Sequence, residues 1–257
     1  MKPHAAFLAL LAGLMGFACA AAAAEPSSVT VNIVHENATG VLRINGVPVH
    51  RFGTGAAASG KVTDTIGAGL WLVEGENVID VESRAKSGGS TQVIIVRTIG
   101  DPTLFERTID GAGAAQYKLT LAGVPRWGWL DAEVWEGDDT ALLAAVAALR
   151  AACAKPDVKA LLAAFKPFDD DVRPYIGPQL AGAEKELSQT LKGAKVAALP
   201  GDLSVARFYG NRLFVVQTAD GAPPIAVSNE KIVKGRPVLE PGQYWIRKNG
   251  KWSIIRP

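Results

Sequence analysis

Indole rings and carboxylates alternate in a short stretch near the middle of the chain, PRWGWLDAEVWE. If this stretch is extended, Trp127, Trp129 and Trp135 share one face with Asp131 and Glu133, because successive side chains of a strand point to opposite sides. Aromatic rings beside carboxylates are typical of a stacking platform for a sugar or another flat ligand. Packing between two domains is the alternative, because tryptophan is highly buried on average.

Cationic and aromatic side chains gather at the C-terminal end of the sequence. Residues 231–257 hold Tyr244, Trp245 and Trp252, with Glu240 as the single acid among seven basic residues. The basic residues are Lys231, Lys234, Arg236, Arg247, Lys248, Lys251 and Arg256. Such a patch could hold an anionic glycan, a lipid head group or nucleic acid, although export from the cytoplasm disfavours the last of these. A solvated face of a sheet, or docking against an acidic first domain, is the alternative interpretation.

Residues that commonly catalyse reactions are sparse. His35 and His50 are the two histidines after residue 24, and neither has a Cys or a second His at the spacing of metal ligands. The run Asp169–Asp171 lacks the glycine and the distal glutamate of a calcium loop. An acid/base pair of carboxylates assembled by folding stays open. The sequence therefore favours a non-catalytic protein without cofactor or metal, with an envelope enzyme acting on a glycan as the alternative.

The elements upstream of the tryptophans have a period of two. Val29 to Ile33 alternate with polar residues, and Asn45-Gly46 lies between two further apolar alternations. This dipeptide predicts a hairpin, because a type I′ turn needs two positive φ angles. Further strands are expected at residues 70–73, 78–81, 91–98, 104–109 and 117–122. Many short strands with frequent turns indicate an antiparallel β-sandwich or barrel.

Two segments of this half carry a resemblance to a known architecture. Ile44-Asn45-Gly46-Val47, followed by LVEGENVIDV at residues 72–81, resembles the rhythm of jelly-roll and immunoglobulin-like β-sandwich modules. The resemblance implies an antiparallel β-sandwich over residues 25–136. Such modules accompany many secreted glycan-active proteins.

Downstream of the tryptophans the apolar period changes to that of helices. Helices are expected at residues 140–154, at 158–165 with Pro167 ending it, and at 179–192. Strands are expected at residues 203–208, 213–217, 225–227, 244–247 and 252–255. Helices followed by an antiparallel meander form an α+β order, which predicts a second domain over residues 137–257.

This second half resembles the cone-shaped nuclear-transport-factor-2-like superfamily. The likeness lies in two helices broken at Lys155-Pro156-Asp157 and in the closing sequence WIRKNGKWSI at residues 245–254. The resemblance implies a pocket between helices and sheet, which some members use for catalysis with Asp and His and many use only for binding or assembly. This half contains no histidine, so the binding or assembly role is the one expected here.

The N-terminal residues predict export. Lys2 and an apolar run precede a small-residue region that ends at Ala24, which is the pattern of a cleaved secretory signal peptide over residues 1–24. A lipidated Cys19 is the alternative and would attach the protein to a membrane. After cleavage at Ala24 the chain has 26 basic and 25 acidic residues, so its charge favours neither nucleic acid nor another polyelectrolyte. We expect a periplasmic or secreted protein whose partner is a glycan or an anionic envelope component.

Overall fold

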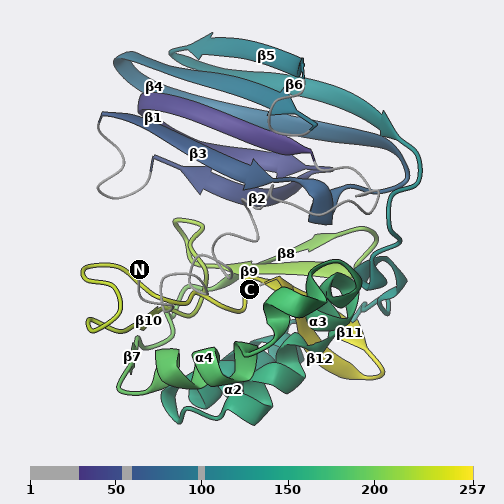
Figure 1. Ribbon diagram of the computed structural model, residues 1–257, viewed down its shortest axis with the longest axis vertical. Helices are drawn as coiled ribbons and strands as arrows, with labels where there is room; N and C mark the ends of the chain where they lie inside the picture. Colours follow the sequence, from purple (N-terminus) through teal and green to yellow (C-terminus); the bar gives the residue numbers. More distant parts are fainter. Residues whose placement is uncertain (1–28, 54–59, 98–101, 257) are drawn as a thin grey trace. The chain divides into compact units, whose positions relative to one another are not determined.

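The computed structural model describes residues 29–53, 60–97 and 102–256 (Figure 1). The chain divides into two compact units, with the boundary between Arg126 and Trp127. Within the described residues, antiparallel strands dominate the first unit, whereas the second combines antiparallel strands with three α-helices. This agrees with the expected β and α+β content. The expected boundary after Glu136 falls within the second unit, and the predicted signal peptide and Cys19 lie outside the described residues.

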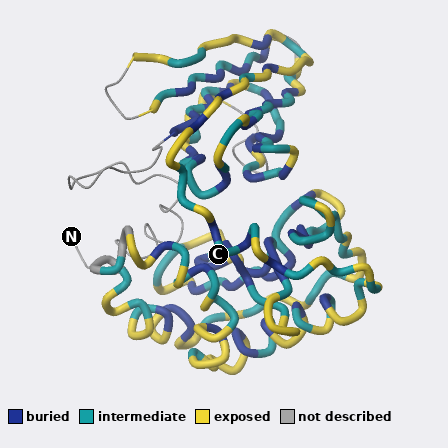
Figure 2. Tube along the Cα trace, turned by 90° about the vertical axis from the view of Figure 1, so that its right-hand side faces the viewer, coloured by how far each residue is buried: buried dark blue, intermediate teal, exposed yellow. Residues whose placement is uncertain are grey.

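The first unit is one six-stranded antiparallel sheet built around two long strands. Its strands are β1 (Thr30–Ile44), β2 (Val47–Phe52), β3 (Lys61–Gly67), β4 (Gly75–Val96), β5 (Thr103–Asp110) and β6 (Ala112–Leu121). β1 and β4 pair along nearly their whole length. The first part of β1 pairs also with β3 and its second part with β2, while β6 and β5 pair with the two parts of β4. Buried and exposed positions alternate along several of these strands (Figure 2).

Both long strands bend at the same level. Asn37 has a φ of 49° where the β1–β4 register shifts, and Gly88 on β4 has a φ of 76°. A Cβ on Gly89 would lie 2.7 Å from the carbonyl oxygens of Glu36 and Asn37, so only glycine lets the two backbones approach this closely. The bend folds the sheet onto itself.

A substitution of Gly40 on β1 can test how closely the strands of this sheet pack. A Cβ there would lie 2.2 Å from the backbone oxygen of Glu82 and 2.1 Å from Cζ of Phe52. We expect Gly40→Ala to lower the free energy of unfolding by about 1–3 kcal/mol, because neither neighbour can move without disturbing the sheet. Gly201→Ala, which meets no atom within 4 Å, is the control. Denaturant unfolding measures both, and a wild-type midpoint for Gly40→Ala would contradict the packing.

The first unit confirms one predicted element and contradicts another. Asn45 and Gly46 have φ angles of 52° and 83°, which confirms the predicted hairpin between β1 and β2. The predicted strand at residues 70–73 is wrong, because residues 69–71 form the 3₁₀ helix η2 (Gly69–Trp71). The buried side chain of Asn77 accepts a hydrogen bond from the Val73 N–H and donates one to the Val73 carbonyl. These bonds occupy the groups that a strand at residues 70–73 would have used.

The second unit places helices against an antiparallel sheet. The helices are η3 (Gly128–Asp131), α2 (Thr140–Ala154), α3 (Val158–Leu180) and α4 (Ala183–Leu191). The strands are β7 (Lys195–Val196), β8 (Ser204–Phe208), β9 (Leu213–Gln217), β10 (Val227–Ser228), β11 (Tyr244–Lys248) and β12 (Lys251–Arg256). The main sheet has the order β12-β11-β9-β8, and β7 pairs with β10. Leu142, Val146, Phe214 and Trp245 belong to the apolar core that joins helices and sheet.

Helix α3 differs from the expectation. Pro167 does not end it, and the helix continues to Leu180. Phe168 and Val172 are buried beyond the proline, and the pairs Lys166–Asp170 and Arg173–Asp169 join residues four apart on the helix. Packing and ion pairs together outweigh the one hydrogen bond that the proline removes. The acidic run Asp169–Asp171 therefore lies on this helix.

Cys153 on α2 provides a test of the helical core. Its side chain is buried in the apolar core, and burial raises the pKa of the thiol to about 11. We expect iodoacetamide at pH 8 to label Cys153 slowly in the native protein and rapidly in guanidinium chloride, because the reactive thiolate is scarce and shielded. Mass spectrometry of the labelled chain measures the ratio. Equal labelling rates in the two conditions would contradict the burial.

Candidate functional sites

The tryptophan stretch is irregular instead of extended. Residues 128–131 form η3, and the Leu130 N–H donates to the Trp127 carbonyl. The alternation that would place five side chains on one face is therefore absent, so the stretch is not the extended platform considered from the sequence. Trp129 is fully buried and its ring packs edge-on against Tyr209, with the ring centroids 4.8 Å apart.

The segment after η3, residues 133–139, is held against the sheet of the second unit; we call it the strap. The Glu133 N–H donates to the Arg247 carbonyl, and the Trp135 N–H donates to the Asn211 carbonyl. Glu133 in turn accepts a hydrogen bond from the Gly250 N–H at 2.9 Å. The Asn249-Gly250 turn between β11 and β12 has the two positive φ angles that present this N–H.

Two arginines fix the strap. Arg207 on β8 donates to the carbonyls of Trp135 and Gly137 and pairs with Asp139 at 2.7 Å. Arg247 on β11 pairs with Glu133 at 3.3 Å and lies over the Trp135 ring at 4.3 Å from the ring centroid. The indole of Trp135 therefore has a cation on its face and is not an open platform.

Trp252 joins the same aromatic group. Its ring lies edge-on to Trp135 and to Phe214, with centroid distances of 6.1 and 5.1 Å. Trp135 and Trp252 are thus two predicted site residues whose rings are in contact. Trp245 belongs to the apolar core, where its Nε1–H donates to the Gly242 carbonyl at 2.5 Å.

Trp127 and Tyr244 lie beside a buried arginine. The guanidinium of Arg256 on β12 lies 5.9 Å from the Trp127 ring centroid and 5.7 Å from that of Phe168, and Arg256 is opposite Tyr244 in the sheet. Burial lowers the pKa of Arg256 to about 10, so it stays a cation at neutral pH. Asp171 is its nearby counter-charge, and burial raises the pKa of that carboxyl.

The buried tryptophans predict a loss of stability on truncation. Trp127 and Trp129 are 5% and 0% exposed. We expect Trp127→Ala and Trp129→Ala to cost on the order of 3–5 kcal/mol each, because each leaves a large cavity. Val134→Ala, at a position that is 44% exposed, should change stability little. Thermal unfolding measures all three, and wild-type midpoints for both tryptophan variants would contradict the packing.

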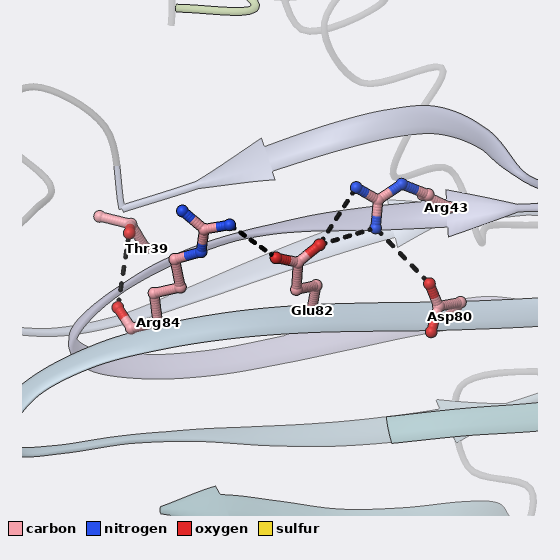
Figure 3. A network of polar contacts seen from close by, with 5 residues as sticks. All are labelled: Thr39, Arg43, Asp80, Glu82 and Arg84. Atoms are coloured by element: carbon pink, nitrogen blue, oxygen red, sulfur yellow. Dashed lines mark hydrogen bonds and ion pairs between the residues drawn. The ribbon is translucent and has the colours of Figure 1, made fainter. Parts of the chain in front are cut away.

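The neighbouring carboxylates of Asp80 and Glu82 on β4 are both bound by arginine (Figure 3). Arg43 bonds to Glu82 at 3.2 Å and pairs with Asp80 at 3.5 Å, while Arg84 donates to the other oxygen of Glu82 at 3.1 Å. Hydrogen bonds from Arg84 and then Arg43 lower the pKa of Glu82. A general acid needs a raised pKa, so this pair is suited to holding β1 against β4.

Serines followed by a lysine at the third position occur twice, at Ser83 and Ser228. Ser83 and Lys86 both lie on β4, where residues three apart point to opposite faces, whereas β10 ends at Ser228 and a turn at Asn229 separates it from Lys231. Ser83 Oγ lies 2.7 Å from Thr91 Oγ1 inside the folded sheet. Neither serine therefore has its lysine as a neighbouring base.

The two described histidines meet at one carboxylate. Asp64 Oδ2 on β3 lies 3.1 Å from His50 Nε2 on β2 and 3.4 Å from His35 Nε2 on β1. His35 is 1% exposed and packs against Phe52, with ring centroids 5.2 Å apart. The hydrogen bond with His50 is the largest cause that lowers the pKa of Asp64, and the charge of both imidazoles adds to it. Both histidines were candidates from the sequence and Asp64 was not, because no strand was predicted at residues 61–67.

Five exposed cations lie on the two chain segments, residues 192–195 and 231–236, that flank the buried side chain of Asn229. Its Nδ2 donates to the carbonyls of Thr190 and Lys192, and its Oδ1 accepts from the Lys231 N–H. We call the five cations around it the basic face; they are Lys192, Lys195, Lys231, Lys234 and Arg236. All five side chains are exposed, and in the described part of the chain none of them forms an ion pair.

The structure and the comparisons add three negative findings. Over residues 29–53, 60–97 and 102–256, no cluster of three or more His, Cys, Asp or Glu side chains could hold a metal ion. Within the same residues, no helix has the length and apolar character to span a membrane. No protein-family model matches the chain, and neither a curated protein sequence nor a solved structure matches it.

Proposed function

We propose that this protein is an exported, non-catalytic binding protein of the cell envelope that binds an acidic glycan through its basic face. Its first unit would be a β-sandwich of the jelly-roll or immunoglobulin-like kind, and its second a cone of the nuclear-transport-factor-2-like kind. Export rests on the pattern of residues 1–24. The binding role rests on the second unit.

The observation that carries the proposal is the contrast between two sets of cations. Arg207, Arg247 and Arg256 are directed into the protein, where carboxylates and aromatic rings accompany them. The basic face has no such partners, and Glu230 is the one acid within residues 229–237. Its backbone is nevertheless held in place by Asn229 and by the pairing of β7 with β10. An ordered, unneutralised set of cations fits a ligand with repeated negative charges.

A sugar polymer fits this surface better than a lipid bilayer. Proteins that bind a membrane surface combine cations with exposed apolar or aromatic side chains. In the described residues, the exposed large apolar side chains are Val134 and Leu162, and neither belongs to the basic face. Ile232 and Val233, between its lysines, pack partly against the apolar core.

The enzyme alternative has less support. Arginines neutralise the carboxylates of Asp80 and Glu82. Arginines also pair with Glu133 and Asp139, the two carboxylates at the ends of the strap. A glycosidase would need two carboxylates across a cleft, one of them with a raised pKa. Asp171 has a raised pKa, but Gly128 and Arg256 are the groups that it faces.

Charge reversal of the basic face tests the proposal. Binding of the full-length protein to polygalacturonate is measured by calorimetry at two salt concentrations, with neutral dextran as the reference polymer. We expect the variant Lys231→Glu, Lys234→Glu, Arg236→Glu to lose at least about tenfold in affinity, because each cation near a polyanion contributes roughly 1 kcal/mol. Binding of the unchanged protein should weaken as salt screens the charges.

The control variant carries the same change in net charge elsewhere. Lys61→Glu, Lys155→Glu, Lys159→Glu reverses three exposed lysines outside the basic face and should bind as the unchanged protein does. Equal losses in both triple variants would show that net charge alone is responsible and would overturn the site. Binding to phosphatidylglycerol vesicles without binding to polygalacturonate would overturn the glycan and assign the surface to lipid.

A further inference from the structure

The folded sheet of the first unit has a seam between β2 and β3. Each of these strands pairs with β1, at different parts of it, and the described strands show no pairing between the two. Side chains cross the seam instead. His50 on β2 lies 3.1 Å from Asp64 on β3, and His35 on β1 lies 3.4 Å from the same carboxylate oxygen.

The inner position of these side chains follows from the strand registers. His50 lies opposite Leu42, which is fully buried, and Asp64 lies opposite Ile33, which is also fully buried. The three groups therefore point to the inside of the folded sheet. Asp64 and His50 are about a quarter exposed, at 27% and 23% for their side chains, so solvent reaches one end of the cluster and not His35.

The charge of the cluster is unbalanced when both imidazoles are neutral. Asp64 then carries one negative charge, and the two histidines are the charged or chargeable groups that act on it. Three charged residues on the same strands point to the outer face, because each lies an odd number of positions from the cluster member on its strand. They are Glu36 beside His35, Arg51 beside His50, and Lys61 three positions before Asp64. From β4, Ser83 and Thr91 present hydroxyl groups that bond to each other. One added proton would make the cluster electrically neutral.

We infer that His35, His50 and Asp64 form a proton-operated clasp, in which a proton taken up by His50 tightens β2 against β3 on acidification. His50 is the group that solvent can reach, and imidazole is the side chain that ordinarily changes charge between about pH 5 and 8. His35 is enclosed by the sheet and packs on Phe52.

The proton balance is simple. In the neutral form His50 Nε2–H donates to Asp64 Oδ2, and its Nδ1 carries no hydrogen. A proton from solvent binds Nδ1, so the same hydrogen bond becomes an ion pair, which is stronger than its neutral counterpart. The lowered pKa of Asp64 keeps this carboxylate charged throughout the range. The ionised Asp64 carboxylate contributes to stability above the ordinary aspartate pKa of about 3.9. This contribution is lost as pH falls through the lowered pKa that Asp64 has in the folded protein.

The test compares full-length variants at about pH 8 and about pH 5.5. Thermal unfolding gives the midpoint, and amide hydrogen exchange of peptides from β2 and β3, corrected for intrinsic rates, reports on the seam itself, with β6 as the internal reference. In the unchanged protein the midpoint of the first unit should rise by about 2–4 °C on acidification, and β2 and β3 should exchange more slowly. Asp64→Asn and His50→Gln should each flatten both responses.

Controls separate the clasp from general charge effects. Glu76→Gln removes an exposed carboxylate that pairs with Lys118, away from the seam, and should keep the wild-type response. His50→Gln tests the same contact if Asp64→Asn fails to fold. A flat response in the unchanged protein, or a wild-type response in both seam variants, would overturn the clasp. A midpoint that zinc chloride raises in the unchanged protein and not in Asp64→Asn would replace it with a metal site.

Discussion

The attachment of the strap to its sheet is the constraint on which the second unit depends. The strap has no regular secondary structure, so its carbonyl groups need donors from elsewhere. Arg207 donates hydrogen bonds to the carbonyls of Trp135 and Gly137 and also pairs with Asp139. The planar guanidinium group can make all three contacts at once, whereas the compact ammonium group of a lysine could not. The strap in turn brings Trp135 onto Arg247 and against Trp252, which covers Phe214 of the core.

This constraint divides the cations of the second unit by chemistry. Guanidinium groups serve the interior, where Arg207, Arg247 and Arg256 meet carboxylates, carbonyls and rings at once. The cations of the basic face, four lysines and Arg236, are exposed, and Lys248 and Lys251 are exposed at the β11–β12 turn. A count of basic residues over 231–257 mixes these two sets, and it overstates the charge available to a ligand. Only part of the C-terminal basic region is open to solvent, and Lys192 and Lys195 extend that part from α4 and β7.

Local signals in the sequence predicted the elements that local interactions determine. Both Asn-Gly turns have the expected positive φ angles, and α2 spans the predicted residues 140–154. The predictions of secondary structure are wrong where contacts between residues far apart in the sequence determine the conformation. Asn77 turns the chain at residues 70–73 through its side chain, and burial of Phe168 carries α3 past Pro167. The long strand β4 was predicted as separate pieces, because the glycines at its bend resemble a turn until β1 is placed beside them.

The same reasoning explains what was missed in the candidate sites. The six aromatic residues chosen from the sequence do not form one group, because η3 interrupts the alternation that would have aligned the first three. Conversely, His35, His50 and Asp64 lie on three strands and show no spacing that a sequence motif could capture. Their meeting follows from the fold: β1 bends, so its two parts pair with β3 and β2, and the bend brings those two edges together. A one-residue feature, the positive φ of Asn37, thus helps to place three ionisable groups within hydrogen-bonding reach, and no inspection of those groups alone would have joined them.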